Sequence, residues 1–492
     1  MTEPLLGAER DLLDTVEAGP RALRGSALRS AGYVAGLVLG LAAAPLLIRH
    51  LGVITFGAYV TATVILTIVS GLTEGGLNAV ALRGYATSHG VDRDQLMRNA
   101  LGARLTLSAA GVVVAIAFAA GAGYGSSLVL GVTFAGLGLI LQLMQSILLV
   151  PLQSEMRLGS ATLVDLVRQV VAVMLIVTLV LAGRGLVALL AVAIPASLVS
   201  LVLTATLVRQ LTPLLPAVHP AQWWPLLRDS IPYAAAIAVN VLYFRLAVIL
   251  TSLLAGDVET GYFSTSFRVV EVIIGLPALL IGAAFPILAR AQRDDPERFR
   301  YATRRIFELA LLSGTWLVVV LEAGAPFAVH VLAGSQANPA IDVLRIQGVG
   351  IVATFVIAAC AFPLLSLRRY RAMLVSNIVA LGVSASLVSA LIPSLGARGA
   401  AIGAAAGEAA LALLVAVVLI RAIPQLRLRL DVVAVAAAAG AAALAAGLAL
   451  PAPSLVQAIV AAFVYLAALK LMRRLPPEAH QLVRGFRSTA VG

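Results

Sequence analysis

The stretch Ala161–Val208 reads ATLVDLVRQVVAVMLIVTLVLAGRGLVALLAVAIPASLVSLVLTATLV. Its two apolar runs, 161–182 and 186–208, are separated only by a Gly-Arg-Gly turn. A helix needs about 20 mostly apolar residues to cross the roughly 30 Å hydrocarbon core of a bilayer. Each run is long enough for one crossing, so this stretch predicts a hairpin of two transmembrane helices.

Apolar runs of the same kind fill almost the whole chain. Of its 492 residues, 61% are hydrophobic and 12% are charged, and the mean hydropathy is +1.01. The predicted spans are 28–48, 58–80, 102–123, 127–150, 161–182, 186–208, 231–254, 261–288, 306–331, 341–366, 373–394, 397–420, 431–450 and 454–471. The runs are continuous and lack the short alternating segments of a membrane barrel. We therefore expect an all-α integral membrane protein with about 14 transmembrane helices.

The basic residues lie mostly on one side of this predicted topology. With the N-terminus in the cytoplasm, most arginines fall in inner loops and tails, including the dense loop 290–305. The outer loops hold only Arg49, Arg184 and Arg398, with Arg345 at a boundary. An excess of Lys and Arg marks cytoplasmic loops. The net charge of +12 is therefore a topology signal rather than a sign of nucleic-acid binding. It predicts both termini on the cytoplasmic side of the plasma (inner) membrane.

Few residues suit a metal or a cofactor. The single cysteine, Cys360, lies in an apolar run, and the five histidines are scattered without metal-ligand spacing. No Gly-x4-Gly-Lys-Ser/Thr motif occurs, so ATP is not expected as the direct energy source. We expect no catalytic residue, no metal and no cofactor, with transport either downhill or coupled to H⁺ or Na⁺.

Two segments indicate an internal repeat. HLGVITFGAYV at 50–60 and LAGDVETGYFS at 254–264 both read Gly-x4-Gly-x-aromatic, with their glycines 204 residues apart. A second pair, DRDQL at 92–96 and DPERF at 295–299, is separated by 203 residues. An even number of predicted helices separates the copies, so the two halves have the same orientation.

The repeat predicts how the chain is organised. We expect a cytoplasmic segment 1–27, a six-helix lobe 28–208, a cytoplasmic linker 209–230, a second six-helix lobe 231–420, two extra helices within 431–471 and a cytoplasmic tail 472–492. Duplicated halves are typical of transporters, whose substrate site lies between the repeats and opens to each side in turn. A central cavity between the lobes is therefore expected.

At these segments the chain resembles the polysaccharide (Wzx-type) flippases of the multidrug/oligosaccharidyl-lipid/polysaccharide (MOP) exporter superfamily. The matching pieces are Arg49-His50-Leu51-Gly52, Phe56-Gly57-Ala58-Tyr59, Glu74-Gly75-Gly76-Leu77 with Arg83, Tyr243-Phe244-Arg245, Val258 to Tyr262 with Arg268, Phe285-Pro286 and Leu344-Arg345-Ile346. One departure is Ala247, because the family often has an acidic residue two positions after the arginine of the seventh span.

The resemblance implies a flippase that moves a polyprenyl-diphosphate-linked oligosaccharide to the outer leaflet for cell-surface polysaccharide synthesis by alternating access. Its partners would be that lipid, the membrane lipids, and the glycosyltransferases and polymerase of the same pathway. Two other functions stay open. One is a MATE-like exporter of drugs or other organic cations, which would favour acidic groups in the cavity. The other is a membrane glycan polymerase or ligase, or a scaffold subunit of a glycan assembly complex.

Ionisable residues inside spans are functional candidates, because a charge in hydrocarbon costs several kcal/mol. Arg245 lies about 13 residues into the seventh span and Arg268 about seven residues into the antiparallel eighth, which predicts a similar depth. Arginine's planar fork binds phosphate oxygens bidentately. We therefore expect the two arginines to bind the diphosphate, unless they serve only to neutralise carboxylates.

Further polar residues share these two helices. The candidate substrate-binding set is Arg245, Arg268, Glu271, Asn240, Tyr243 and Ser264. Ser264, Arg268 and Glu271 form an i, i+4, i+7 stripe on the eighth span. Asn240, Tyr243 and Ser264 would meet sugar hydroxyls.

Two further carboxylates lie in predicted spans. Glu74 is near the inner end of the second span between glycines, and Glu408 is about halfway along the twelfth. Either is a candidate for ion coupling by carrying a proton. The alternative for both is a structural hydrogen bond to a neighbouring helix.

Overall fold

The computed structural model describes residues 18–74, 76–217, 220–282, 285–423, 425–426, 428 and 431–474. Within these residues the regular structure is helical, as the continuous apolar runs predict. The chain divides into two compact units: Met1–His50 with Ala62–Ala238, and Leu51–Thr61 with Val239–Gly492. The limits 28–208 and 231–420 for two membrane lobes stay predictions.

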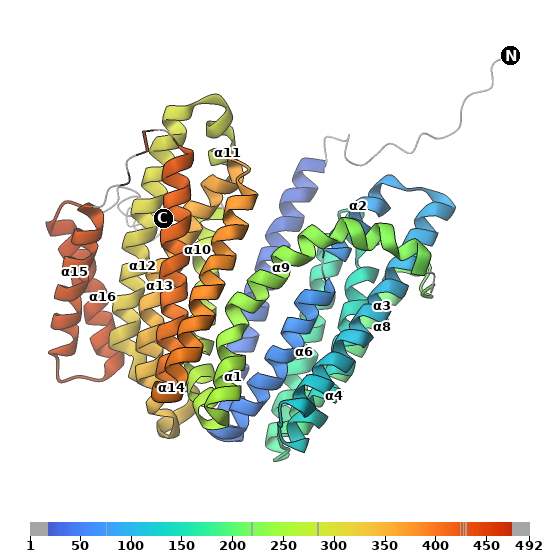
Figure 1. Cartoon of the computed structure of the whole chain (residues 1–492), viewed down its shortest axis with the longest axis horizontal. Coiled ribbons are helices and arrows are strands. Elements are labelled where there is room, and N and C mark those ends of the chain that lie inside the picture. Colours follow the sequence, from blue (N-terminus) through green and yellow to red (C-terminus); the bar gives the residue numbers. More distant parts are fainter. Residues whose placement is uncertain are drawn as a thin grey trace, which may run out of the picture. The chain divides into compact units, whose positions relative to one another are not determined.

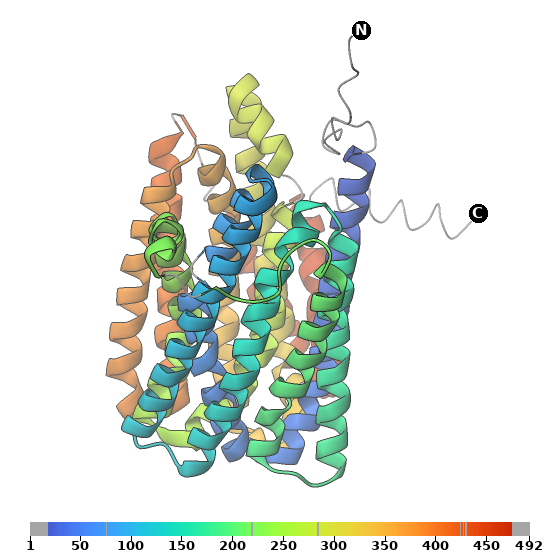
Figure 2. The same cartoon turned by 90° about the vertical axis from the view of Figure 1, so that its right-hand side faces the viewer.

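The first unit is a helical bundle. Its helices are α1 (Ala18–Glu74) without the segment Leu51–Thr61, α2 (Leu77–Thr87), α3 (Gly90–Gly121), α4 (Ser126–Leu148), α5 (Val150–Ser154), α6 (Leu158–Leu181), α7 (Leu186–Ala191) and α8 (Ala193–Val208), followed by the start of α9 (Pro220–Leu254). Helix α4 packs against α3, α7 and α8, and α6 packs against α8. Figure 2 faces this unit and shows its long helices running alongside one another.

The second unit is built around α13. It contains the end of α9, then α10 (Gly256–Gly282), α11 (Phe285–Asp294), α12 (Pro296–Ala333), η2 (Gly334–Ala337), α13 (Pro339–Ser366), α14 (Tyr370–Ala422), α15 (Asp431–Leu448) and α16 (Ser454–Leu471). Helix α13 packs against α10, α12 and α14. Helices α15 and α16 pack against α12, at the left of Figure 1. There the Tyr465 hydroxyl donates to the Leu312 carbonyl at 3.0 Å.

Two of the longest helices break at a glycine. In α1 the break is Gly52, with φ 70° and ψ 170°, and in α14 it is Gly396, with φ 56° and ψ −134°. These backbone angles are open to glycine at little cost. The carboxylate of Glu259 accepts the Ala397 N–H at 2.7 Å, so it satisfies a backbone donor that the break in α14 leaves free.

Eleven helices among the described residues are long and apolar enough to cross a membrane. The all-α membrane class is therefore confirmed, whereas the count of about 14 spans is not. Part of the difference comes from the glycine breaks. The candidate Tyr370–Ala422 contains two predicted spans, and Val38–Thr87 contains 58–80 and about half of 28–48. In addition, the predicted span 261–288 falls mostly on α10 (Gly256–Gly282), which is not among the eleven.

The repeated Gly-x4-Gly segments have matching geometry. Both first glycines, Gly52 and Gly256, have positive φ, at 70° and 80°. The second glycine of each copy packs against the other copy. A Cβ at Gly57 would overlap the Asp257 carbonyl oxygen, and a Cβ at Gly261 would overlap the Val53 carbonyl oxygen. Glycine is therefore needed at both positions for close backbone approach, which supports the proposed repeat.

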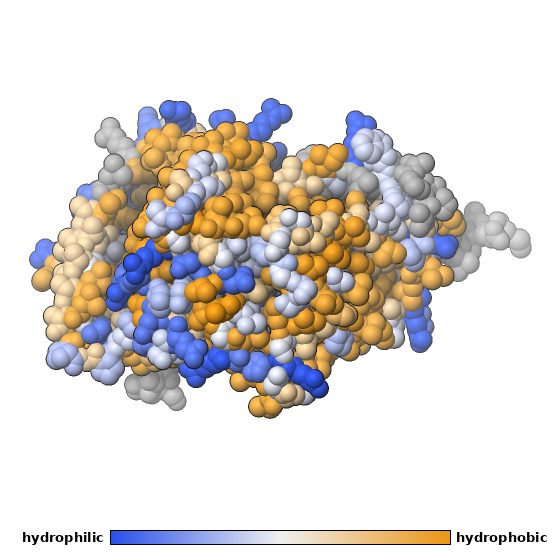
Figure 3. Space-filling model, turned by 60° about the horizontal axis from the view of Figure 1, so that its bottom comes forward, coloured by the Kyte–Doolittle hydropathy of each residue, from blue (hydrophilic) through white to orange (hydrophobic). Residues whose placement is uncertain are grey.

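The exposed surface is that of a membrane protein. Many large apolar side chains lie open, including Leu181 at 80% and Phe463 at 68% exposure. In Figure 3, hydrophobic residues cover broad areas of the face in view, and hydrophilic residues gather in patches between them. Continuous apolar surface of this extent is unfavourable in water and is expected against lipid tails.

Candidate functional site

A three-residue charge cluster joins α9 to α10. Arg245 Nη2 donates to Glu271 Oε1 at 2.8 Å, and Arg268 Nη1 donates to Glu271 Oε2 at 2.8 Å. One carboxylate thus serves two guanidinium groups, and the cluster keeps one net positive charge. Arg245 also lies over the ring of Phe267, 5.9 Å from its centroid, a distance at which a cation–π attraction operates.

The cluster remains open to a ligand. The side chains of Arg245, Arg268 and Glu271 are 25%, 40% and 31% exposed. Arg268 and Glu271 are three residues apart on α10, so they share one helix face, and Arg245 reaches them from α9. The similar depth predicted for the two arginines agrees with their contact with the same carboxylate. Each guanidinium has further N–H groups that an anionic ligand can use.

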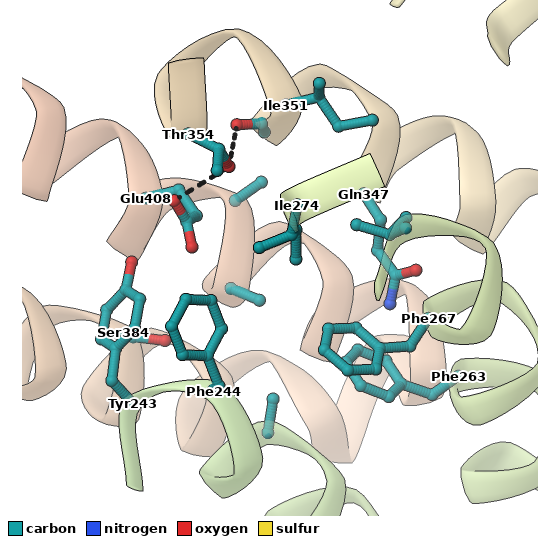
Figure 4. Close-up of a pocket in the computed structure, with 15 residues that line it drawn as sticks. Tyr243, Phe244, Phe263, Phe267, Ile274, Gln347, Ile351, Thr354, Ser384 and Glu408 are labelled. Carbon is teal, nitrogen blue, oxygen red and sulfur yellow. Dashed lines mark hydrogen bonds between the residues drawn. The ribbon is translucent and has the colours of Figure 1, made fainter. Parts of the chain in front are cut away.

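The other predicted substrate residues are not bonded to this cluster in the described structure. Asn240 is exposed on α9. Ser264 is 4% exposed, and its Oγ has no hydrogen-bond partner within the described residues. Tyr243 is 8% exposed and points into a separate pocket toward Glu408 (Figure 4). The stripe of Ser264, Arg268 and Glu271 thus supplies two ion-pair members and one buried hydroxyl.

The pocket beside Tyr243 lies within the second unit and has a cavity volume of about 50 Å³. It is bordered by aromatic rings and by Glu408, Thr354 and Gln347 (Figure 4). Thr354 Oγ1 lies 3.2 Å from Glu408 Oε2 and 3.3 Å from the Gly350 carbonyl. A hydroxyl has one proton to donate, so Thr354 can serve only one of these acceptors fully at a time. Gln347 is 7% exposed and neither of its amide atoms has a partner in the described part of the chain.

A third polar cluster surrounds Arg104 in the first unit, and the sequence reasoning missed it. Arg104 is 0% exposed. It donates to the Thr73 carbonyl at 2.9 Å, to Asn78 Oδ1 at 3.0 Å and to Ser146 Oγ at 3.3 Å. Asn78 Nδ2 in turn donates to Glu74 Oε1 at 3.2 Å. The predicted coupling residue Glu74 is therefore linked to a buried arginine through a neutral amide.

In the predicted topology, Arg104 is one of the arginines on the cytoplasmic side. Its position inside the predicted span 102–123 is the feature of the sequence that indicates burial. Its guanidinium meets the C-terminal end of α1, whose last carbonyls have no partner within the helix. This arrangement stabilises the junction between α1 and α2.

The described residues contain no group of three His, Cys, Asp or Glu side chains that could hold a metal ion. Cys360 is buried. The chemistry that the three clusters offer is therefore binding of anions, hydrogen bonding and proton transfer.

Comparison with known proteins identifies the family and the fold. A sequence model of the family described as "Polysaccharide biosynthesis protein" matches residues 22–292, more than half of the chain. No curated protein sequence matches. Among solved structures, the chain is similar to the lipid II flippase MurJ in an inward closed conformation. The TM-score is 0.75 at 11% identity, over 91% of this chain and 99% of that one.

Two other solved structures share the fold. An inward-facing multidrug resistance MATE family transporter of the MOP superfamily gives a TM-score of 0.64 at 16% identity, over 80% of this chain and 95% of that one. A MOP superfamily transporter from Pyrococcus furiosus gives 0.51 at 16% identity, over 84% and 95%. At these identities the structures show a common fold alone. The chain therefore belongs to the polysaccharide biosynthesis protein family and is a multi-pass membrane protein with the fold of MOP superfamily transporters.

Proposed function

We propose that the protein is a flippase. It moves a polyprenyl-diphosphate-linked oligosaccharide from the cytoplasmic to the outer leaflet by alternating access, for cell-surface polysaccharide synthesis. Membership of the polysaccharide biosynthesis family and the MOP fold support this proposal.

The observation that carries the proposal is the cluster of Arg245, Arg268 and Glu271. A diphosphate needs cationic donors to leave water for a low-dielectric environment. Two part-exposed arginines on neighbouring helices supply them, and each has a planar fork that matches phosphate oxygens. Glu271 holds both guanidinium groups together when no substrate is bound. The net positive charge then favours an anion over a cation.

Glu408 is the better candidate for ion coupling. It borders a cavity of about 50 Å³, and one water molecule needs about 15 Å³ of such space. The cavity therefore has room for water molecules beside Glu408. When Glu408 is charged, Thr354 donates to it. When Glu408 is protonated, it can donate to Thr354, which then donates to the Gly350 carbonyl. Replacing Glu408 by Gln should flatten the dependence of transport on an imposed pH gradient.

Export of organic cations is the second candidate, and the Glu408 pocket is the observation that favours it. A carboxylate beside aromatic rings suits a cation. However, a cavity of about 50 Å³ is far below the roughly 300–1,000 Å³ of a pocket for a drug-sized ligand. The pocket fits water or a small ion better than a drug.

The test is a headgroup-accessibility assay in proteoliposomes with a fluorescent polyprenyl-diphosphate saccharide. The wild type should move the lipid across the bilayer, and Arg245→Ala and Arg268→Ala should fold but transport slowly. Arg293→Ala is the matched control, because this arginine is 78% exposed and forms an ion pair with its neighbour Asp294, away from the cluster.

Two outcomes would contradict the proposal. If the wild type moves no lipid but exports an amphipathic cation from the same vesicles, the protein is a cation exporter. If it moves neither, and instead extends or transfers the glycan or only retains glycan-assembly proteins, the polymerase, ligase or scaffold function replaces the flippase.

A further inference from the structure

A second cavity, of about 210 Å³, lies inside the first unit between α1, α5 and α6. Its polar lining consists of Gln153, Thr162, Asp165 and Gln169. Leucine side chains complete the wall, among them Leu166. This cavity is roughly four times larger than the one beside Glu408, and the candidate substrate residues predicted from the sequence do not line it.

The sequence of α6 explains the polar face. Thr162, Asp165 and Gln169 stand at i, i+3 and i+7, so they lie on one side of the helix. The Thr162 hydroxyl donates to the Leu158 carbonyl of its own helix at 2.9 Å, which leaves its oxygen free to accept. Gln153 comes from the short helix α5.

On the side of α1, the cavity is lined by Gly32. Gly32 and Gly36 are one turn apart on α1. A Cβ at Gly32 would overlap the Thr162 methyl, and a Cβ at Gly36 would overlap the Gln169 side-chain amide. Small residues at this spacing allow helices to approach closely in membranes. Any larger residue at Gly36 would displace Gln169 from its place in the cavity wall.

We infer that this cavity binds a sugar residue of the transported lipid. The inference rests on the proposed flippase function and adds a site for recognition of the saccharide. One carboxylate, two amides and a hydroxyl provide both donors and acceptors, which is what the hydroxyl groups of a sugar require. The leucines can pack against the apolar C–H faces of the ring.

The lining disfavours other classes of ligand. Of the described residues that line the cavity, none is basic, so a phosphate would find no compensating charge. None is aromatic either, so an organic cation would meet the Asp165 carboxylate without a ring to pack against. The α5–α6 connection lies on the side that the arginine distribution assigns to the cytoplasm, where the lipid-linked saccharide is made in the proposed function.

The experiment compares saccharides on one lipid. The probes are fluorescent polyprenyl diphosphates that carry a single sugar, a series of oligosaccharides differing in one sugar, or no sugar. Binding to the purified full-length protein in nanodiscs is measured by fluorescence anisotropy, and transport is measured in proteoliposomes. The variants are Gln169→Leu, Asp165→Asn and Gly36→Ala. The control is Gln95→Leu, the same change at an exposed position of α3.

We expect the wild type to bind some of the saccharides more tightly than others. In the cavity variants, the ratio of these affinities should fall roughly 2- to 10-fold, the effect of one or two hydrogen bonds. Binding of the sugar-free diphosphate should change less than twofold. By contrast, Arg245→Ala should weaken binding of all probes alike.

Equal discrimination by the cavity variants and Gln95→Leu would overturn the inference, as would an equal loss for the sugar-free lipid. The binding arm separates the two proposals. If the wild type binds saccharides selectively through Gln169 and Asp165 but moves none of them, the sugar site stands and the flippase function fails.

Discussion

Each of the two units holds a cluster centred on arginine, and the clusters differ in the groups that contact the positive charge. In the second unit, Arg245 and Arg268 contact a carboxylate directly, and their side chains are 25% and 40% exposed. In the first unit, Arg104 is fully buried and donates hydrogen bonds to a carbonyl, an amide and a hydroxyl. Exposure and partner type together distinguish a charge that can bind a ligand from one that holds helices together.

The largest effect is expected at Arg104. Replacing it by Leu removes three hydrogen bonds of a fully buried side chain and leaves the part-buried acceptors on Thr73, Asn78 and Ser146 short of a partner. Unsatisfied buried groups cost about 1–3 kcal/mol each, so we expect a loss of about 3 kcal/mol or more. Thermal unfolding in detergent, followed by intrinsic fluorescence, measures it. A variant of normal stability that does not transport would show that Arg104 serves transport, and the comparison would fail.

The next effect is on transport at Arg245. Charge-assisted hydrogen bonds contribute about 1.5–3 kcal/mol, so Arg245→Ala should slow transport of the diphosphate lipid about 10- to 100-fold. The melting temperature should change little, because Glu271 keeps its contact with Arg268. Arg245→Lys keeps the charge without the planar fork and should give an intermediate rate. A large fall in melting temperature would instead mean that this cluster is structural, like that of Arg104.

Glu271→Gln tests the same cluster by changing its carboxylate instead of an arginine. This change removes the negative charge that the two arginines share, so an anionic headgroup meets less competition. We expect roughly 2- to 10-fold tighter binding of a polyprenyl diphosphate, together with slower release and hence slower transport. Anisotropy and proteoliposome assays on the same preparation measure the two quantities. Weaker binding would show that Glu271 itself contacts the substrate.

The smallest effect is expected at Asn78. Asn78→Ala removes the neutral link between Glu74 and Arg104, but the contacts of Arg104 with Thr73 and Ser146 remain. We expect a loss of about 1 kcal/mol and a transport rate within about twofold of wild type. A double-mutant cycle with Glu74→Gln measures the coupling between the two side chains. No coupling would mean that the link from Asn78 to Glu74 contributes nothing to stability.

The sequence predicts the helical membrane class well, because long apolar runs have few alternatives in a bilayer. The ends of some helices match the prediction, as in α16 and the predicted span 454–471, whereas α3, α9 and α12 begin about ten residues before their predicted spans. The number of separate spans is less predictable. At Gly52 and Gly396, two predicted spans follow each other across a single glycine with non-helical backbone angles, without a loop between them.

The candidate site was predicted in part. Residue spacing places Arg268 and Glu271 on one face and suggests the depth of Arg245. The shared carboxylate could not be predicted, because it depends on how α9 is rotated against α10. The same limit applies to Tyr243, which is three residues from Asn240 but points toward Glu408. The cluster around Arg104 was not predicted, because the distribution of arginines along the chain does not show which side chains are buried.

The two Gly-x4-Gly segments have one further consequence. Gly57 meets the carbonyl of Asp257, and Gly261 meets that of Val53; each partner lies 204 residues from its counterpart. A contact in which i meets j and j meets i is what two identical subunits make across a twofold axis. Within one polypeptide, each half thus supplies what a second copy would supply to a homodimer. A larger residue at Gly57 would therefore disturb the backbone at Asp257, and a larger residue at Gly261 would disturb the backbone at Val53.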